Sequence, residues 1–186
     1  TWHYAVVVGY DLNREELISR SGINRRETLS FNTFEYIWKQ AGYWAYIVLP
    51  LDELPATVNE NQYAQSASAL EESGHLSHAK IAYQTLVKRW PKNLIGQIGL
   101  GNTSYALGDL KLAKLALTQA IQNHPESAMA HNNLAHVLAD LGDMKEAIKT
   151  AEKAVSLGGP LLEDTKATLK EIELKERNLK LRSKKK

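Results

Sequence analysis

His3 is the residue of this 186-residue chain that is best placed for acid–base chemistry, because it opens a run of apolar residues. A neutral imidazole can take a proton from a nucleophile and return it to a leaving group when a second polar group orients the ring. The sequence contains no cysteine, so the chain has no thiol nucleophile, no thiolate metal ligand and no disulfide. The alternative is a surface histidine without a role.

The group that orients His3 can be sought by distance along the expected strands. Asp11 is the obvious carboxylate, but it stands at the far end of the same strand, roughly 26 Å away at about 3.3 Å per residue. A hairpin after Asp11 would instead bring Ser21 opposite His3, with Asn24 just beyond it. We therefore predict a catalytic set of His3 with Ser21 or Asn24, although a serine orients an imidazole less strongly than a carboxylate does.

The other histidines are interpreted as parts of a helical repeat. His75 and His78, spaced i, i+3, could share a metal ion, but no third ligand lies nearby in the sequence. We therefore predict neither a metal site nor another cofactor. The remaining members of this group are His124, His131 and His136.

The first fifty residues alternate between strand-like runs and turns. The run at 4–10 is rich in β-branched and aromatic residues, which indicates a buried strand. Ser30 is placed to cap a helix that presents Phe34, Ile37 and Trp38 on its apolar face. We expect strands at residues 4–10, 16–20, 26–29 and 43–49, and a helix at residues 32–40.

The residues around His3 follow an ordered pattern. His3 opens a strand that ends in Gly9-Tyr10-Asp11, and a helix with Phe34 and Trp38 comes before the last strand. Over residues 2–50 this order resembles the C-terminal half of bacterial papain-like cysteine peptidases of the C39 type, including C39-like proteins that are followed by tetratricopeptide repeats.

The resemblance implies a nucleophilic mechanism. A cysteine attacks a carbonyl, His3 takes its proton, and an Asp or Asn orients the imidazole at the position where this chain has Ser21. The chain opens without Met and directly in a strand-like run, so we expect the cysteine in a missing N-terminal half-domain and no activity from this chain alone. The family also suggests the bacterial cell envelope or periplasm.

From about residue 60 the chain repeats with a period of 34 residues. A glycine ends the first helix of each unit, a small alanine lies near the start of the second helix, and a proline closes that helix in two units. Such a period is typical of a helix–turn–helix solenoid. The positions are Gly74, Gly108 and Gly142; Ala79, Ala113 and Ala147; and Pro91 and Pro125.

These units resemble the tetratricopeptide repeat. The large residue of that motif matches Tyr63 and, more weakly, Gln97 and His131, and its Leu-Gly pair is Leu100-Gly101. A terminal helix would cap the stack, because each unit buries its apolar face only against a neighbour. We predict a linker at residues 51–59, repeats at 60–93, 94–127 and 128–161, and a capping helix with a basic tail at 162–186.

Solenoids of this kind hold partner proteins and seldom catalyse. The first helices of the units are expected to line a concave groove, which suits an extended peptide or a protein helix. Lysines and arginines that would grip a carboxylate are absent from the groove positions. The predicted groove residues are Ser68, Glu71, Asn102, Tyr105, Asn132 and His136.

Positive charge gathers at the C-terminal end. Residues 166–186 carry nine Lys or Arg against three Glu, in a chain whose net charge is +2. Such a tail could bind nucleic acid or anionic lipid, but no aromatic residues lie among the cations, so we favour a solvated helix and predict no nucleic-acid partner. No run approaches the roughly 18 apolar residues of a transmembrane segment.

The expected fold class is α+β, with a partial papain-like, β-rich half-domain followed by an all-α tetratricopeptide-repeat solenoid. The expected function is that of a fragment of a C39-like cysteine peptidase whose repeats bind a protein substrate or partner. The alternative is a non-catalytic adaptor with a degenerate peptidase-like N-terminal region, which Ser21 in place of Asp favours.

Overall fold

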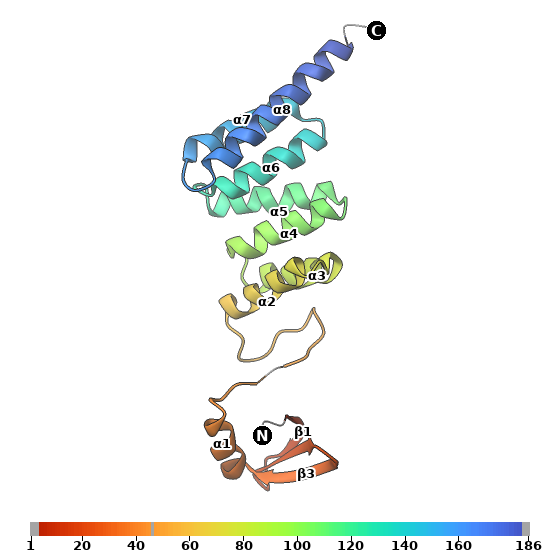
Figure 1. Ribbon diagram of the computed structural model, residues 1–186, viewed down its shortest axis with the longest axis vertical. Coiled ribbons are helices and arrows are strands. Elements are labelled where there is room, and N and C mark those ends of the chain that lie inside the picture. Colours follow the sequence, from red (N-terminus) through yellow and green to blue (C-terminus); the bar gives the residue numbers. More distant parts are fainter. Residues whose placement is uncertain (1–3, 46, 184–186) are drawn as a thin grey trace. The chain divides into compact units, whose positions relative to one another are not determined.

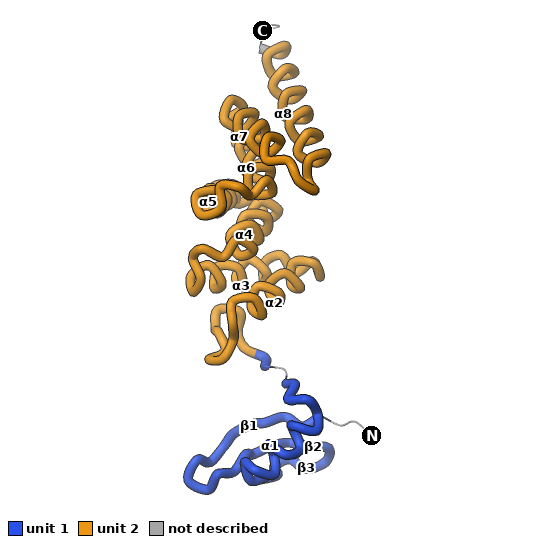
Figure 2. The backbone as a smooth tube through the Cα atoms, turned by 90° about the vertical axis from the view of Figure 1, so that its left-hand side faces the viewer, with its two compact units in different colours: residues 1–48 blue, residues 49–186 orange. Residues whose placement is uncertain are grey.

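The computed structural model describes residues 4–45 and 47–183, which fall into two compact units. In the described residues, the first unit holds a sheet and one helix, and the second holds helices and their connections (Figure 1). The division lies between Val48 and Leu49 (Figure 2). The chain is therefore mostly helical, with a small antiparallel sheet at its N-terminal side.

The sheet of the first unit is antiparallel, with its strands in the order β1-β2-β3. The first hairpin depends on Asp11, whose Oδ1 accepts the main-chain N–H groups of Asn13 and Arg14 at 2.9 and 3.1 Å. The second hairpin turns at Gly22, where φ is +55°, and the following helix is capped by Ser30 as predicted. The elements are β1 (Ala5–Asp11), β2 (Glu16–Ser21), β3 (Asn24–Ser30) and α1 (Phe31–Gln40).

The stretch after α1 is a turn followed by irregular chain, so the prediction of a strand at residues 43–49 is wrong for the described residues of that range. Gly42 and Tyr43 have φ values of +75° and +58°, which bend the chain away from an extended path. The indole N–H of Trp38 donates to the Trp44 carbonyl at 2.8 Å and so occupies an acceptor that a strand ladder would need. The unit therefore lacks the last expected strand in its described residues, and β1, which was expected to be buried, exposes Val6, Val7 and Val8.

The second unit is a stack of helix pairs, which Figure 1 shows from α2 to α7 with α8 at the end. A glycine with positive φ ends the first helix of each pair, as predicted: φ is +79° at Gly74, +80° at Gly108 and +84° at Gly142. The helices are α2 (Glu60–Glu72), α3 (Leu76–Arg89), α4 (Leu94–Ala106), α5 (Leu110–Asn123), α6 (Ala128–Asp140), α7 (Met144–Leu157) and α8 (Leu162–Ser183).

Small residues let the helices approach closely. Ala79, Ala113 and Ala147 are completely buried, which confirms their predicted role at the start of each second helix. In α4, Gly99 faces the ring of Tyr83 from α3, and a Cβ on Gly99 would lie 2.2 Å from Tyr83 Cζ. The Tyr83 ring therefore packs directly on the backbone of α4.

The two ends of the stack are covered in different ways. At the first repeat, the Leu51 carbonyl accepts hydrogen bonds from Tyr63 Oη at 2.9 Å and Thr85 Oγ1 at 3.1 Å. The stretch predicted as a linker therefore contacts both α2 and α3. At the last repeat, α8 packs against α6 and α7 and buries Ile172.

Candidate functional site

The predicted catalytic residues are only partly within the described chain. Ser21 and Asn24 form a cross-strand pair at the turn between β2 and β3, and Ser21 pairs with Ala5 of β1 on its other side. His3 lies outside the described residues. The catalytic set of His3 with Ser21 or Asn24 stays a prediction.

Three of the predicted groove residues gather around one cavity. A hollow of about 370 Å³, which we call the amide hollow, lies between α4, α5 and α6. Asn102, Tyr105 and His136 line it, and the buried side chains of Leu117 and Val137 supply an apolar wall. Asn133, which the sequence analysis did not single out, completes the lining.

Asparagine amides connect the helices at this hollow. Asn133 Nδ2 donates to Asn102 Oδ1 at 2.8 Å, and Asn132 Nδ2 donates to Asn133 Oδ1 at 3.5 Å. Asn132, a predicted groove residue, does not line the hollow, and its Oδ1 atom is buried without a donor in the described part of the chain. His136 Nε2 lies 3.1 Å from Thr168 Oγ1 of α8. Of the two asparagines that line the hollow, Asn102 has an Nδ2 group that donates to no described residue.

A polar bracket joins α4, α6 and α8 beside the hollow. Tyr105 Oη donates to Asp140 Oδ2 at 2.5 Å, and Lys175 Nζ donates to Asp140 Oδ1 at 2.6 Å. The hydrogen bond to the carboxylate, together with burial, raises the pKa of Tyr105 to about 12. The Lys175 ammonium and the Tyr105 hydroxyl lower the pKa of Asp140, so this carboxylate is ionised near neutral pH.

The predicted groove residues of the first repeat lie at a separate place. Tyr83 Oη donates to Glu71 Oε2 at 2.6 Å and is 3.2 Å from Ser68 Oγ. Burial and the Glu71 carboxylate raise the pKa of Tyr83. Ser68 and Glu71 are therefore held by a tyrosine from α3, and they do not line the amide hollow.

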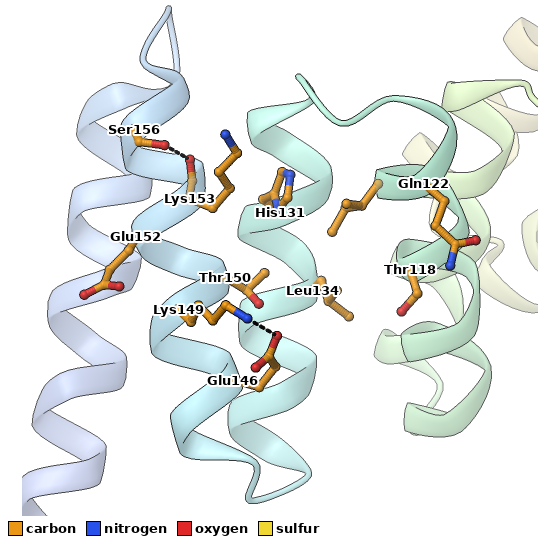
Figure 3. Close-up of a pocket in the computed structure, with 11 residues that line it drawn as sticks. Thr118, Gln122, His131, Leu134, Glu146, Lys149, Thr150, Glu152, Lys153 and Ser156 are labelled. Carbon is orange, nitrogen blue, oxygen red and sulfur yellow. Dashed lines mark hydrogen bonds and ion pairs between the residues drawn. The ribbon is translucent and has the colours of Figure 1, made fainter.

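A second cavity of about 600 Å³, the outer hollow, lies between α5, α6 and α7 (Figure 3). His131 lines it and its Nε2 lies 3.1 Å from the Pro125 carbonyl, while burial and the charge of Lys153 lower the pKa of His131. Residue types and spacing did not predict this cavity. A signal was present, because His131 is smaller than Tyr63 at the same motif position. Thr118, Ile121, Gln122, Leu134, Glu146, Lys149, Thr150, Glu152 and Ser156 complete its lining.

The histidine pair considered for a metal lies at the start of α3. The rings of His75 and His78 stack with centroids 6.0 Å apart, and His75 Nδ1 is 3.1 Å from Ser73 Oγ. Within residues 4–45 and 47–183, no group of three potential metal ligands occurs. None of the helices in this part of the chain is both long enough and apolar enough to cross a membrane.

Residues 98–160 match the family model of the tetratricopeptide repeat. This part of the second unit consists of tetratricopeptide repeats. No curated protein matches the chain. The glycines with positive φ and the buried alanines described above are the recurring positions of these repeats.

Solved structures share this fold at low sequence identity. The TPR2B domain of yeast Sti1, in a complex with pHsp70, is 15% identical with a TM-score of 0.59, over 62% of this chain and 96% of that one. The type III secretion translocator chaperone SycD of Yersinia enterocolitica is 22% identical with a TM-score of 0.60, over 68% of this chain and 91% of that one. SycD in complex with a peptide of the translocator YopD is 20% identical with a TM-score of 0.58, over 66% of this chain and 99% of that one.

Proposed function

We propose that this chain is a protein-binding adaptor whose tetratricopeptide repeats hold an extended segment of a partner along α2, α4 and α6. The amide hollow lies at the centre of the proposed site. The observation that carries the proposal is the gathering of Asn102, Tyr105 and His136 around one cavity that also offers an apolar wall. Polar groups that converge on an apolar hollow are the usual composition of a ligand site.

The solved structures with this fold add support, because two of them are complexes with a bound partner. Sti1 TPR2B is in a complex with pHsp70, and SycD is in a complex with a YopD peptide. Repeats of this type present an extended concave binding surface, and the amide hollow would form one part of it. A peptide segment is therefore the partner class that suits this chain best.

A selection of random peptides displayed on phage tests the proposal with the whole chain as bait. We expect peptides to be enriched, and we expect His136→Arg, which places a large side chain in the amide hollow, to weaken a selected peptide by about tenfold. Lys149→Ala in the outer hollow is the matched control and should bind as the wild type does. Failure to enrich any peptide, or equal binding by His136→Arg, would contradict the proposal.

A second candidate concerns the first unit, where the order of three antiparallel strands and a helix favours a C39-like origin. In this hypothesis His3 is the ancestral catalytic histidine, and Ser21 or Asn24 orients it. The coding sequence upstream of Trp2 provides the test. A cysteine followed by a helical pattern within about 100 residues would support a papain-like enzyme, since domains are typically of that size. The absence of such a cysteine would contradict the enzyme hypothesis and leave the adaptor function as the proposal.

A further inference from the structure

We infer that the amide hollow takes an extended peptide by its main-chain amides and that the repeat surface around it rejects acidic segments. The inference rests on the proposed function and deepens it, because it names the chemistry of the partner. Two independent features of the second unit carry it: the Nδ2 donor of Asn102, which no described residue uses, and the distribution of charge over α2, α4 and α6.

The asparagines at the hollow match the main chain of a peptide. A primary amide offers two N–H donors and a carbonyl acceptor, which complement a peptide's C=O and N–H groups. Asn102 Nδ2 lies at the hollow and donates to no described residue, so it can donate to a main-chain carbonyl of a ligand.

The apolar wall of the hollow limits how much of a ligand can be polar. Leu117 and Val137 are each 1% exposed and border the same cavity as Asn102 and Asn133. A small apolar side chain fits against this wall while the neighbouring main-chain groups reach the amides. Recognition of this kind depends on an extended backbone and only weakly on sequence.

The charges on α2, α4 and α6 disfavour acidic peptide segments relative to neutral or basic ones. Helices α2, α4 and α6 contain no lysine or arginine, and their charged residues are Glu60, Glu71, Glu72 and Asp140. Lys175 of α8 approaches this surface, but its ammonium is bonded to Asp140 at 2.6 Å. A carboxylate entering the hollow would lose water and meet no free cation on these three helices, which is unfavourable.

The outer hollow does not share these properties. Glu146, Glu152, Lys149 and Lys153 line it, so both signs of charge are present, and Lys149 Nζ is 3.5 Å from Glu146 Oε1 (Figure 3). The charges of its lining therefore favour neither an acidic nor a basic ligand. It serves as the control surface for the experiment.

The test uses the 186-residue chain as bait for a phage library of random peptides a dozen residues long. We expect the selected peptides to contain Asp and Glu at less than half their frequency in the unselected library. The double variant Asn102→Ala with Asn133→Ala should bind a selected peptide about tenfold more weakly. Gln122→Ala removes an exposed amide of α5 at the outer hollow and should leave the affinity unchanged.

A variant that adds a positive charge to the hollow tests whether charge determines which peptides bind. Asn133→Lys combined with Glu71→Gln should select peptides enriched in Asp and Glu, because a cation then faces the ligand. Circular dichroism shows whether each variant is folded, and Asn102→Lys replaces Asn133→Lys if that variant unfolds. Enrichment of acidic peptides by the wild type, or no change in selection by the lysine variant, would overturn the inference and leave the proposed function standing. The absence of any selected peptide would overturn both.

Discussion

Tyr105 and Asp140 lie 35 residues apart, on the first helices of two successive repeats, and a 2.5 Å hydrogen bond from hydroxyl to carboxylate joins them. Lys175, another 35 residues along the chain, donates to the second oxygen of the same carboxylate. The spacing is one residue longer than the 34-residue period, so the repeat equivalent of Tyr105 is Ala139 and not Asp140. The bracket therefore links the second repeat, the third repeat and the last helix by polar contacts, beside an apolar core that links them as well.

Replacing Tyr105 by Phe removes the donor and keeps the ring. We expect the free energy of unfolding to fall by about 0.5–1 kcal/mol at neutral pH, because the bond to a charged acceptor is partly screened by solvent. Urea unfolding followed by circular dichroism measures the change. An unchanged midpoint would mean that the hydrogen bond makes no net contribution.

The raised pKa of Tyr105 predicts how this contribution depends on pH. Its pKa rises from 10.0 to about 12 in the folded chain, so the stabilisation is complete below pH 10 and is lost as the pH rises toward 12. The difference in unfolding free energy between the wild type and Tyr105→Phe should therefore shrink over this interval. Tyr83 is present in both proteins, so its own titration cancels. A difference that stays constant from pH 9 to pH 12 would contradict the assignment.

The repeat positions could be predicted from sequence because each has a local cause. Gly108 needs a positive φ after a helix, and Ala113 must be small where two helices meet, so residue type and spacing are sufficient evidence. The bond between Tyr105 and Asp140 has no such signature. It depends on how two successive helices lie side by side, and a 34-residue period does not specify which side chains meet.

The candidate site shows the same division between local and non-local causes. Asn102 and His136 could be placed on one face by helical spacing, and they do line one hollow. Glu71 was placed with them, yet it bonds to Tyr83 of α3, whose ring packs against Gly99 of the next helix, α4. The strand predicted at residues 43–49 failed for a different reason, since β propensity is weak and a local hydrogen bond from Trp38, six residues before Trp44, competes with it.

Gly99→Ala tests the close contact between α3 and α4. The new Cβ would lie 2.2 Å from Tyr83 Cζ, and the ring, only 1% exposed, has little freedom to move. We expect a loss of about 2–3 kcal/mol in urea unfolding. Gly96→Ala is the matched comparison, because its Cβ would lie 2.8 Å from Leu86 Cδ2 and 3.0 Å from Val87 Cγ1, a smaller overlap that should cost less. Adding Tyr83→Leu to Gly99→Ala should cost less than the sum of the two single changes.

Gly108→Ala tests a different kind of constraint in the neighbouring turn. A Cβ at Gly108 would meet no atom within 4 Å, so any loss must come from its φ of +80°. We expect a loss of about 1–2 kcal/mol for alanine. Gly108→Asn should lose less, since asparagine tolerates this conformation better. Equal stability of the alanine variant and the wild type would show that the turn relaxes at no cost.

The hydrogen bonds to the Leu51 carbonyl predict that the chain before α2 is held by two hydroxyl groups. The double variant Tyr63→Phe with Thr85→Val removes both donors and keeps nearly the same side-chain volumes. We expect the main-chain amides of Glu53 and Val58 in this stretch to exchange hydrogen severalfold faster, because local opening becomes easier, while amides of α6 keep their rates. Thr118→Val is the matched control, since among the described residues its hydroxyl donates to the Lys114 carbonyl within α5, at 2.7 Å. Equal exchange in the double variant and the wild type would show that packing, and not these hydroxyls, holds the stretch against the first repeat.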